Sequence, residues 1–284
     1  MSARVVNKKI LIPGRVTEMD VDAPAVAAKA LPGNFVVLRL SEKGERIPLT
    51  IADTDPEVGL VKIVYMVLGK TTALLDTLNP GDMILDFCGP LGKPTAIEKI
   101  GRVVCVGGGT GIAAMHHIAK GHARAGNEVV AVIGARSRDL LLFESELSSF
   151  CHKILVATDD GSAGHKGFVT DVLKSRLAED PEIREVVAVG PVPMMEAVAK
   201  TTKEFGVKTI VSLNPIMVDG IGMCGACRVT VDGAVRFACV DGPEFDAHGV
   251  DFLELKRRLR AFCEDEQLSY REFCECHGQK DHRS

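Results

Sequence analysis

Four residues towards the C-terminus have the types and the spacing to bind iron. Two residues separate Cys224 from Cys227, eleven separate Cys227 from Cys239, and four separate Asp219 from Cys224. A C-x4-C-x2-C run with a distant fourth cysteine is the spacing of a [2Fe–2S] cluster, and Asp219 takes the first position here. A carboxylate carries the same single negative charge as a thiolate, so the total charge would not change. The spacing predicts a [2Fe–2S] cluster on Asp219, Cys224, Cys227 and Cys239.

Two other interpretations of these residues remain open. Three cysteines and an aspartate could hold zinc, although structural zinc prefers cysteine and histidine. The C-x2-C pair could also be a redox-active dithiol. Gly220, Gly222 and Gly225 favour the cluster, because glycines let a loop wrap closely and offer N–H groups to the sulfurs.

The chain has nine cysteines, and in a reducing cytosol they are not expected to form structural disulfides. Cys88, Cys105 and Cys151 fall in or beside predicted core elements, where cysteine behaves as a small hydrophobe. The segment Cys274–His277 could bind a metal, but a frayed terminus is the simpler interpretation.

A second chemical signal is the run Gly107–Gly111, which follows the apolar segment Val103–Val106. Gly109-x-Gly111-x-x-Ala114 fits the G-x-G-x-x-G/A pattern of a strand-to-helix turn that binds a dinucleotide. Such a turn lets phosphate oxygens approach the backbone N–H groups of a helix N-terminus. A tight turn without a ligand is the alternative.

The choice between NAD and NADP stays open at this point. The next predicted strand ends at Gly134-Ala135-Arg136, without an acidic residue to hold a ribose hydroxyl. Arg136 and Arg138 could instead meet a 2′-phosphate, or be solvated.

The elements that must position these residues show two different sequence patterns. Over residues 1–98, short β-rich runs are punctuated by Pro-Gly pairs, a pattern typical of a small β barrel. The predicted strands are Lys9–Ile12, Asn34–Leu40, Arg46–Ala52, Gly59–Val67 and Asp82–Cys88. One helix, Thr71–Leu78, interrupts them.

Over residues 99–215, apolar strands alternate with helices, which predicts a doubly wound parallel sheet covered on both faces. The predicted strands are Arg102–Val106, Glu128–Gly134, Lys153–Ala157, Glu185–Val189 and Val207–Leu213. The predicted helices are Ile112–Ala125, Leu140–Cys151, Phe168–Ala178 and Pro193–Phe205.

The pattern changes again over residues 216–250, the predicted cluster subdomain. A hairpin, Arg228–Val231 and Ala234–Cys239, is expected to turn at Asp232-Gly233, since Asp-Gly favours a type I′ turn. Residues 251–284 form a charged tail, with helices predicted over Val250–Cys263 and Ser269–Cys274.

Composition excludes some classes of function. The net charge is −4, and no basic run marks a nucleic-acid site. No apolar stretch is long enough to span a membrane, and Met1–Pro13 lacks the apolar region of a secretory signal. The sequence therefore predicts a cytoplasmic protein with no nucleic-acid or membrane partner.

Four short motifs, in order, resemble those of the ferredoxin–NADP reductase superfamily, in which a flavin-binding barrel precedes a nucleotide-binding α/β domain. Arg46-Ile47-Pro48-Leu49-Thr50 resembles its arginine-led flavin motif, and Gly69-Lys70-Thr71-Thr72 its second flavin segment. Gly89-Pro90-Leu91-Gly92 resembles the segment that closes the barrel. Gly190-Pro191-Val192-Pro193-Met194 resembles the G-P-x-x-M motif that meets the nicotinamide.

The resemblance implies FAD and NAD(H), or NADP(H), as cofactors. The guanidinium of Arg46 would pair with the FAD pyrophosphate, and Thr50 would be the catalytic residue that hydrogen-bonds near flavin N5. The implied flavin residues are Arg46, Pro48, Leu49, Thr50, Gly69, Lys70, Thr71 and Thr72. The implied nucleotide residues are Gly107, Gly108, Gly109, Thr110, Gly111, Arg136, Asp159, Asp160, Gly190 and Pro191.

Two families within the superfamily share the additional cluster. They are the electron-transfer subunit of dihydroorotate dehydrogenase B and the small subunit of NADH-dependent ferredoxin:NADP oxidoreductase, also called sulfide dehydrogenase. Thr158–Gly167 resembles a motif of both. The first family has four cysteine ligands and the second an aspartate in the first position, so Asp219 favours the second.

The favoured resemblance implies an electron-bifurcating complex. A larger iron–sulfur flavoprotein would oxidise NADPH and reduce ferredoxin, while this chain passes electrons to NAD through FAD and the cluster. The alternatives are the dihydroorotate dehydrogenase pathway and a non-catalytic, zinc-stabilised nucleotide-binding module.

Overall fold

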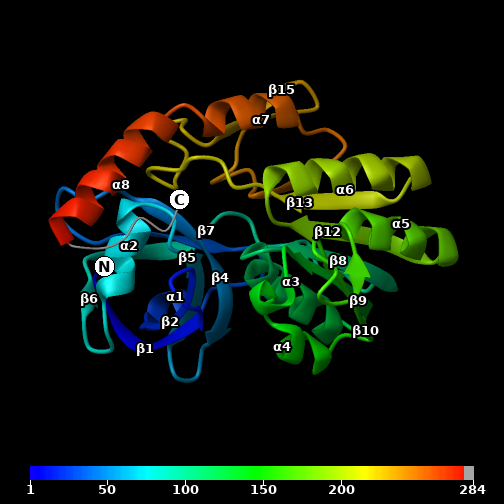
Figure 1. The fold of residues 1–284 in the computed structure, drawn as a ribbon, viewed down its shortest axis with the longest axis horizontal. Coiled ribbons are helices and arrows are strands. Elements are labelled where there is room, and N and C mark those ends of the chain that lie inside the picture. The colour runs from blue at the N-terminus through cyan, green and yellow to red at the C-terminus, as the bar shows by residue number, and fades with distance from the viewer. Residues whose placement is uncertain (278–284) are drawn as a thin grey trace.

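The computed structural model describes residues 1–277, which form a barrel-like antiparallel sheet beside a three-layer α/β domain (Figure 1). Within these residues, no helix is long and apolar enough to cross a membrane.

The N-terminal sheet has seven strands in the order β6-β1-β2-β5-β4-β3-β7. Alternate side chains of these strands point inward and form one core, which includes Val5, Met19, Ile51, Ile63 and Tyr65. The strands are β1 (Ala3–Ile12), β2 (Val16–Asp22), β3 (Phe35–Arg39), β4 (Ile47–Asp55), β5 (Leu60–Met66), β6 (Met83–Ile84) and β7 (Asp86–Leu91), with helices α1 (Pro24–Ala27) and α2 (Lys70–Thr77).

Strand β2 is absent from the sequence-based prediction, and β1 is longer than expected. Acidic residues in β2 conceal its strand pattern, but they are paired in the fold. Lys62 Nζ of β5 lies 2.6 Å from Glu18 and 3.3 Å from Asp20. The single strand expected over Asp82–Cys88 is divided into β6 and β7.

The α/β domain contains a second seven-stranded sheet, in the order β11-β10-β9-β8-β12-β13-β16. Helices α3 and α4 cover one face, and α5 and α6 cover the other (Figure 1). The strands are β8 (Arg102–Gly108), β9 (Glu128–Ala135), β10 (Lys153–Thr158), β11 (His165–Lys166), β12 (Ile183–Val189), β13 (Lys208–Ser212) and β16 (Glu244–Asp246). The helices are α3 (Gly111–Arg124), α4 (Glu144–Ser148), α5 (Val169–Glu179) and α6 (Val192–Phe205).

One predicted helix of this domain was wrong in extent. The expected helix Leu140–Cys151 is reduced to α4 after a 3-10 turn at Arg138–Leu140, because Phe143 between them has a left-handed backbone with φ 59°. All strand pairs within residues 99–215 are parallel, as predicted. The sheet gains one antiparallel edge strand, β16, which pairs with β13 and comes from the later segment 216–250. This edge strand follows the predicted cluster residues and attaches their segment to the sheet.

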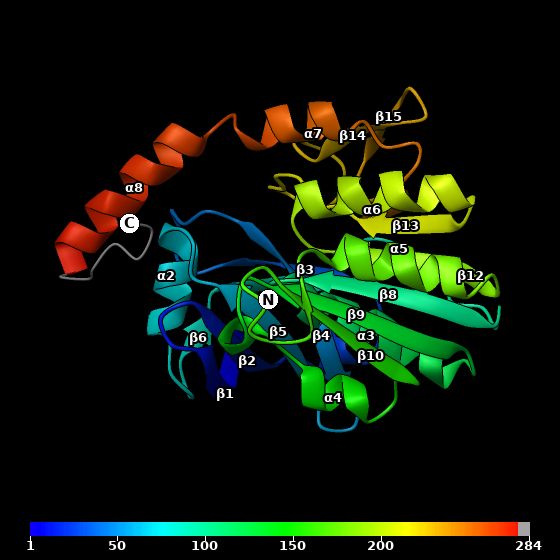
Figure 2. The same ribbon diagram turned by 45° about the vertical axis from the view of Figure 1, so that its right-hand side comes forward.

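The C-terminal segment consists of a hairpin and two helices: β14 (Arg228–Val231), β15 (Ala234–Phe237), α7 (Phe252–Leu259) and α8 (Cys263–His277). Asp232 and Gly233 have φ of 51° and 73°, as a type I′ turn requires. Helices α7 and α8 extend from the α/β domain across to the barrel (Figures 1 and 2).

The prediction of a frayed terminus at Cys274–His277 was wrong, because α8 continues to His277 and packs on α2. Tyr270, Phe273 and Cys274 are buried with Ala73 of α2 in a small apolar cluster. The α8 helix therefore covers the element predicted to face the flavin pyrophosphate.

Candidate functional site

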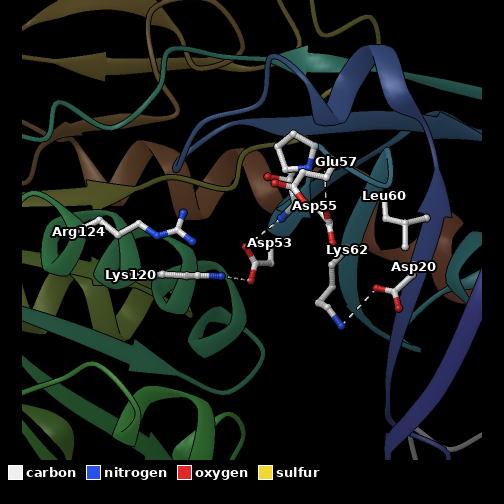
Figure 3. A pocket seen from close by; sticks show the side chains of 10 residues that line it. Asp20, Asp53, Asp55, Glu57, Leu60, Lys62, Lys120 and Arg124 are labelled. Carbon is white, nitrogen blue, oxygen red and sulfur yellow. Dashed lines mark hydrogen bonds and ion pairs between the residues drawn. The ribbon is translucent and has the colours of Figure 1, made fainter.

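Helix α3 of the α/β domain contacts the barrel through a hydrogen bond and an ion pair. His117 Nδ1 lies 3.1 Å from the carbonyl oxygen of Ile51, and Lys120 Nζ lies 2.5 Å from the Asp53 carboxylate, as Figure 3 shows for the lysine. Both barrel partners belong to β4. The helix that begins at the glycine turn is therefore fixed against the strand that contains Thr50.

This contact has a defined charge state. Burial lowers the pKa of His116 and His117, so both rings are neutral near pH 7. Burial raises the pKa of Asp53, but hydrogen bonds from Lys120 and from the Thr54 N–H outweigh it, and the net shift is downward. A charged cleft of about 560 Å³ adjoins this ion pair (Figure 3), and no predicted cofactor residue lines it.

The glycine turn and the Gly190–Met194 segment lie against each other at the carboxyl ends of β8 and β12. A Cβ atom on Gly108 would collide with Sδ of Met194, and one on Gly111 would lie 2.5 Å from the Val189 carbonyl oxygen. A side chain is thus excluded at Gly111, where the contact is with backbone, whereas at Gly108 it would displace the Met194 side chain. Because β9 and β12 flank β8, this is the switch point at which open α/β sheets bind ligands.

A cleft of about 830 Å³ opens at this turn, between the two domains. Its lining includes six of the predicted nucleotide residues: Gly108, Gly109, Thr110, Arg136, Asp159 and Pro191. Gly107, Gly111, Asp160 and Gly190 are not in the lining. Asp160 instead accepts hydrogen bonds from the backbone N–H and hydroxyl of Ser162, at 2.9 and 2.6 Å.

The barrel side of this cleft was missed from the sequence. Arg15, Met66, Val67 and Leu68 line it, and the Val67 N–H donates to the Arg15 carbonyl oxygen at 2.8 Å. The Pro13-Gly14 turn before Arg15 was the available signal, since Gly14 has a φ of 66° and its turn exposes the next residue at the end of β1.

The predicted flavin residues lie outside this cleft, at the starts of β4 and α2. Arg46 is exposed immediately before β4. Pro48, Leu49 and Thr50 belong to β4, where Thr50 pairs with Phe35 of β3. The hydroxyl of Thr71 donates to Glu45, next to Arg46, at 2.5 Å.

The start of α2 is ordered by a side-chain cap. Thr72 Oγ1 accepts the backbone N–H groups of Leu68 and Gly69, both at 3.0 Å. Gly69 precedes the first helical residue, Lys70. The structure thus brings the two predicted flavin segments together through Glu45 and Thr71, and a helix N-terminus faces their junction.

The predicted metal ligands occupy the loop 219–227, here called the cluster loop, and the end of the following hairpin. Cys227 and Cys239 are buried with their Sγ atoms 3.1 Å apart, whereas Cys224 is exposed. Asp219 accepts the backbone N–H groups of Ile221 at 3.0 Å and Cys224 at 2.6 Å. These hydrogen bonds, that from Ile221 first, lower the pKa of Asp219.

Backbone N–H groups also point at the sulfurs, as is usual around iron–sulfur thiolates. Ala226 N lies 3.5 Å from Cys224 Sγ, and Cys239 N lies 3.4 Å from Cys227 Sγ. Gly220, Gly222 and Gly225 have φ between 66° and 85°, so the loop needs glycine at these positions.

The cluster loop packs on the barrel. Cys227 and Cys239 share an apolar cluster with Phe35 and Val37 of β3. A Cβ on Gly220 would lie 2.8 Å from Leu91 Cδ1 of β7 and 3.0 Å from Val37 Cγ2. The ligand residues are thus next to Phe35, the strand partner of Thr50.

The four predicted ligands lie in two pairs. Cys227 Sγ is 3.1 Å from Cys239 Sγ, and the Asp219 carboxylate accepts the backbone N–H of Cys224 at 2.6 Å. A [2Fe–2S] cluster divides four ligands between two irons, so two ligand pairs fit such a group, and the cluster type stays a prediction.

An unused donor also lies beside the loop. Arg258 Nη2 donates to the Ala226 carbonyl oxygen at 2.9 Å. Among the described residues, Nε of the same side chain is buried and has no hydrogen-bond partner. A buried unpaired donor is costly, so its presence here is consistent with an acceptor that the polypeptide does not supply.

Known proteins match both the fold and these segments. Residues 105–200 match the family described as "Oxidoreductase NAD-binding domain", and residues 214–251 match "Iron-sulfur cluster binding domain of dihydroorotate dehydrogenase B". The chain is 50% identical over 274 residues, 96% of each chain, to a Thermotoga maritima protein named "Dihydroorotate dehydrogenase B (NAD(+)), electron transfer subunit homolog". The chain belongs to this family of electron transfer subunits and their homologues.

Two further relatives define its place in the family. The electron transfer subunit of dihydroorotate dehydrogenase B from Geobacillus thermodenitrificans is 35% identical over 84% of this chain and 93% of that protein. A solved structure is described as "Insights into flavin-based electron bifurcation via the NADH-dependent reduced ferredoxin-NADP oxidoreductase structure". It matches with 49% identity and a TM-score of 0.90, over 95% of this chain and 97% of that one.

These matches confirm the predicted resemblance and the fold class of barrel, nucleotide-binding α/β domain and C-terminal iron–sulfur segment. The chain is thus a subunit of the oxidoreductase type within the electron transfer subunit family. All four predicted iron ligands fall within the matched iron–sulfur segment.

Proposed function

We propose that this chain passes electrons between NAD(H) and a larger partner subunit through one FAD and one [2Fe–2S] cluster. The observation that supports this most directly is the packing of Cys227 and Cys239 on β3. The predicted ligands are thereby adjacent to the strand pair that carries Thr50. A flavin bound there would exchange two electrons with a nicotinamide and single electrons with a cluster.

The chain's own residues would bind and orient the groups. The guanidinium of Arg46 is exposed and able to pair with pyrophosphate. The N–H groups at the start of α3, after Gly109, would meet the nucleotide phosphates in the inter-domain cleft. Arg136 and Asp159 line that cleft and would contact the rest of the nucleotide. The hydroxyl of Thr50 would serve as a hydrogen-bond partner near flavin N5.

The partner we propose is a larger iron–sulfur flavoprotein that reacts with NADPH and ferredoxin. The 49% identity to the NADH-dependent ferredoxin-NADP oxidoreductase structure supports it, as does Asp219 in place of a first cysteine. Electron bifurcation itself belongs to that partner, because this chain has the motifs for a single flavin.

A dihydroorotate dehydrogenase partner is the second candidate. Relatives named as electron transfer subunits of that enzyme, or as homologues of it, favour this candidate. The Geobacillus thermodenitrificans subunit is 35% identical, however, whereas the ferredoxin-NADP oxidoreductase structure is 49% identical.

Anaerobic purification of the native complex tests the proposal. We expect FAD, two irons per chain and a co-purifying iron–sulfur flavoprotein, identified by mass spectrometry. The matching assay is NADPH-dependent ferredoxin reduction that requires NAD. Co-purification of a dihydroorotate dehydrogenase would leave the FAD and cluster assignment standing but refute the proposed partner. Zinc without flavin would refute the proposal.

A further inference from the structure

Arg258 of α7 is directed at the C-terminal end of the cluster loop. Its Nη2 donates at 2.9 Å to the carbonyl oxygen of Ala226, the residue before Cys227. Figure 2 shows α7 lying over the segment that contains β14. No predicted function accounts for an arginine at this place, and it was not singled out from the sequence.

The helix that carries Arg258 is fixed at its start and along its length. The Asp251 carboxylate accepts the Glu254 N–H at 2.8 Å as an N-cap. Lys256 Nζ lies 2.8 Å from Glu196 of α6. Phe252 and Leu255 are buried in the core of the α/β domain. The guanidinium of Arg258 is therefore held against the loop by a packed helix.

The charge of Arg258 is not neutralised locally. In residues 1–277 it forms no ion pair with a carboxylate, although its neighbour Lys256 does, and its buried Nε has no partner. Arg228 also donates to the loop, to Gly225 at 3.3 Å. The Arg228 side chain is exposed, so water screens its charge more strongly.

A positive charge beside an iron–sulfur cluster raises its reduction potential, because the reduced cluster carries one more negative charge. We propose that Arg258 is a positioning residue that sets the potential of the [2Fe–2S] cluster through its charge at the Ala226 carbonyl. This inference rests on the proposed function. The reaction concerned is uptake of one electron by the cluster, supplied by dithionite in the test below.

The test is a redox titration of the full-length protein, with the reduced cluster followed by electron paramagnetic resonance. Arg258→Gln and Arg258→Met remove the charge, while Arg258→Lys keeps it. Arg257→Gln is the matched control, because it removes the same charge from the exposed neighbour on α7. We expect the neutral variants to lower the reduction equilibrium constant at least tenfold, which is 59 mV for one electron. The lysine variant and the control should stay near the wild type.

Equal potentials in the wild type and an iron-replete neutral variant would overturn the inference. Loss of iron from both neutral variants, with iron retained in Arg258→Lys, would also overturn it, because the charge would then hold the cluster rather than set its potential. A wild-type protein without iron would instead refute the cluster assignment, and so the proposed function itself.

Discussion

At the scale of single residues, Cys227 is both a predicted iron ligand and a residue that packs the cluster loop on the barrel. Its thiol is buried against Cys239 at 3.1 Å, and its side chain also packs with Phe35 of the barrel. The fold already holds these two thiols close together. Metal binding would therefore cost less side-chain conformational entropy.

We expect Cys227→Ser to lose iron but keep FAD. A serine hydroxyl is a poor iron ligand, while the flavin segments around Arg46 and Gly69 do not contact this position. Cys88→Ser is the matched control, because Cys88 is an exposed cysteine of β7 outside the cluster loop. The measurement is the iron-to-flavin ratio of each purified variant. Normal iron in Cys227→Ser would remove this residue from the ligand set.

At the scale of elements, α3 couples the nucleotide turn to β4 and adds a dependence on pH. Burial lowers the pKa of His117 in the folded state below that of a free histidine. As pH falls below about 6.5, the unfolded chain therefore binds protons that the folded chain does not. Stability from this residue is complete above that pH and is lost as pH falls towards the folded pKa.

His117→Gln should flatten this dependence. Glutamine can still donate to the Ile51 carbonyl oxygen but does not titrate. Each such histidine contributes at most about 1.4 kcal/mol per pH unit to the slope. Urea unfolding of both proteins between pH 7 and pH 5 measures it. His152→Gln is the control, because that ring is exposed. An unchanged slope in His117→Gln would show that folding does not lower the pKa of His117.

The second coupling of elements is between α8 and α2. We expect Phe273→Asp to weaken FAD binding, because a carboxylate cannot remain in the apolar cluster beside Ala73 of α2. Displacement of α8 would loosen the helix that begins at Lys70. Flavin fluorescence titration gives the dissociation constant, with Glu272→Gln, an exposed neighbour, as the control. Unaltered FAD affinity in a folded Phe273→Asp protein would show that α8 does not support the flavin site.

Local patterns explain which elements could be predicted. The Asp232-Gly233 turn depends on its own two residues, so the hairpin was predicted correctly. The glycine turn and the cluster spacing are also local. Strand β2 could not be found, because Glu18 and Asp20 are tolerated only through Lys62 on another strand. The Arg15 side of the cleft and the position of Arg258 likewise depend on how the domains pack.

At the scale of the whole molecule, the cluster loop lies where the barrel, the α/β domain and the C-terminal helices meet, and its outer side is apolar. Ile221 and Met223 are 56% and 82% exposed, and Val240 beside Gly222 is 39% exposed. Large apolar side chains exposed together are typical of interaction surfaces. Their place next to Cys224 favours the electron-transfer partner as the occupant.

Met223→Asp tests whether the partner subunit covers this surface. The change leaves the ligands intact, so the visible spectrum and the iron content should stay normal. It adds a charge that would be desolvated in an apolar interface, which costs several kcal/mol and should reduce the co-purifying partner at least tenfold. Val235→Asp is a suitable control, because this apolar side chain is also exposed, at 59%, but lies on the hairpin outside the cluster loop. Full recovery of the complex with Met223→Asp would mean that electrons leave the molecule from a face other than the one above Cys224.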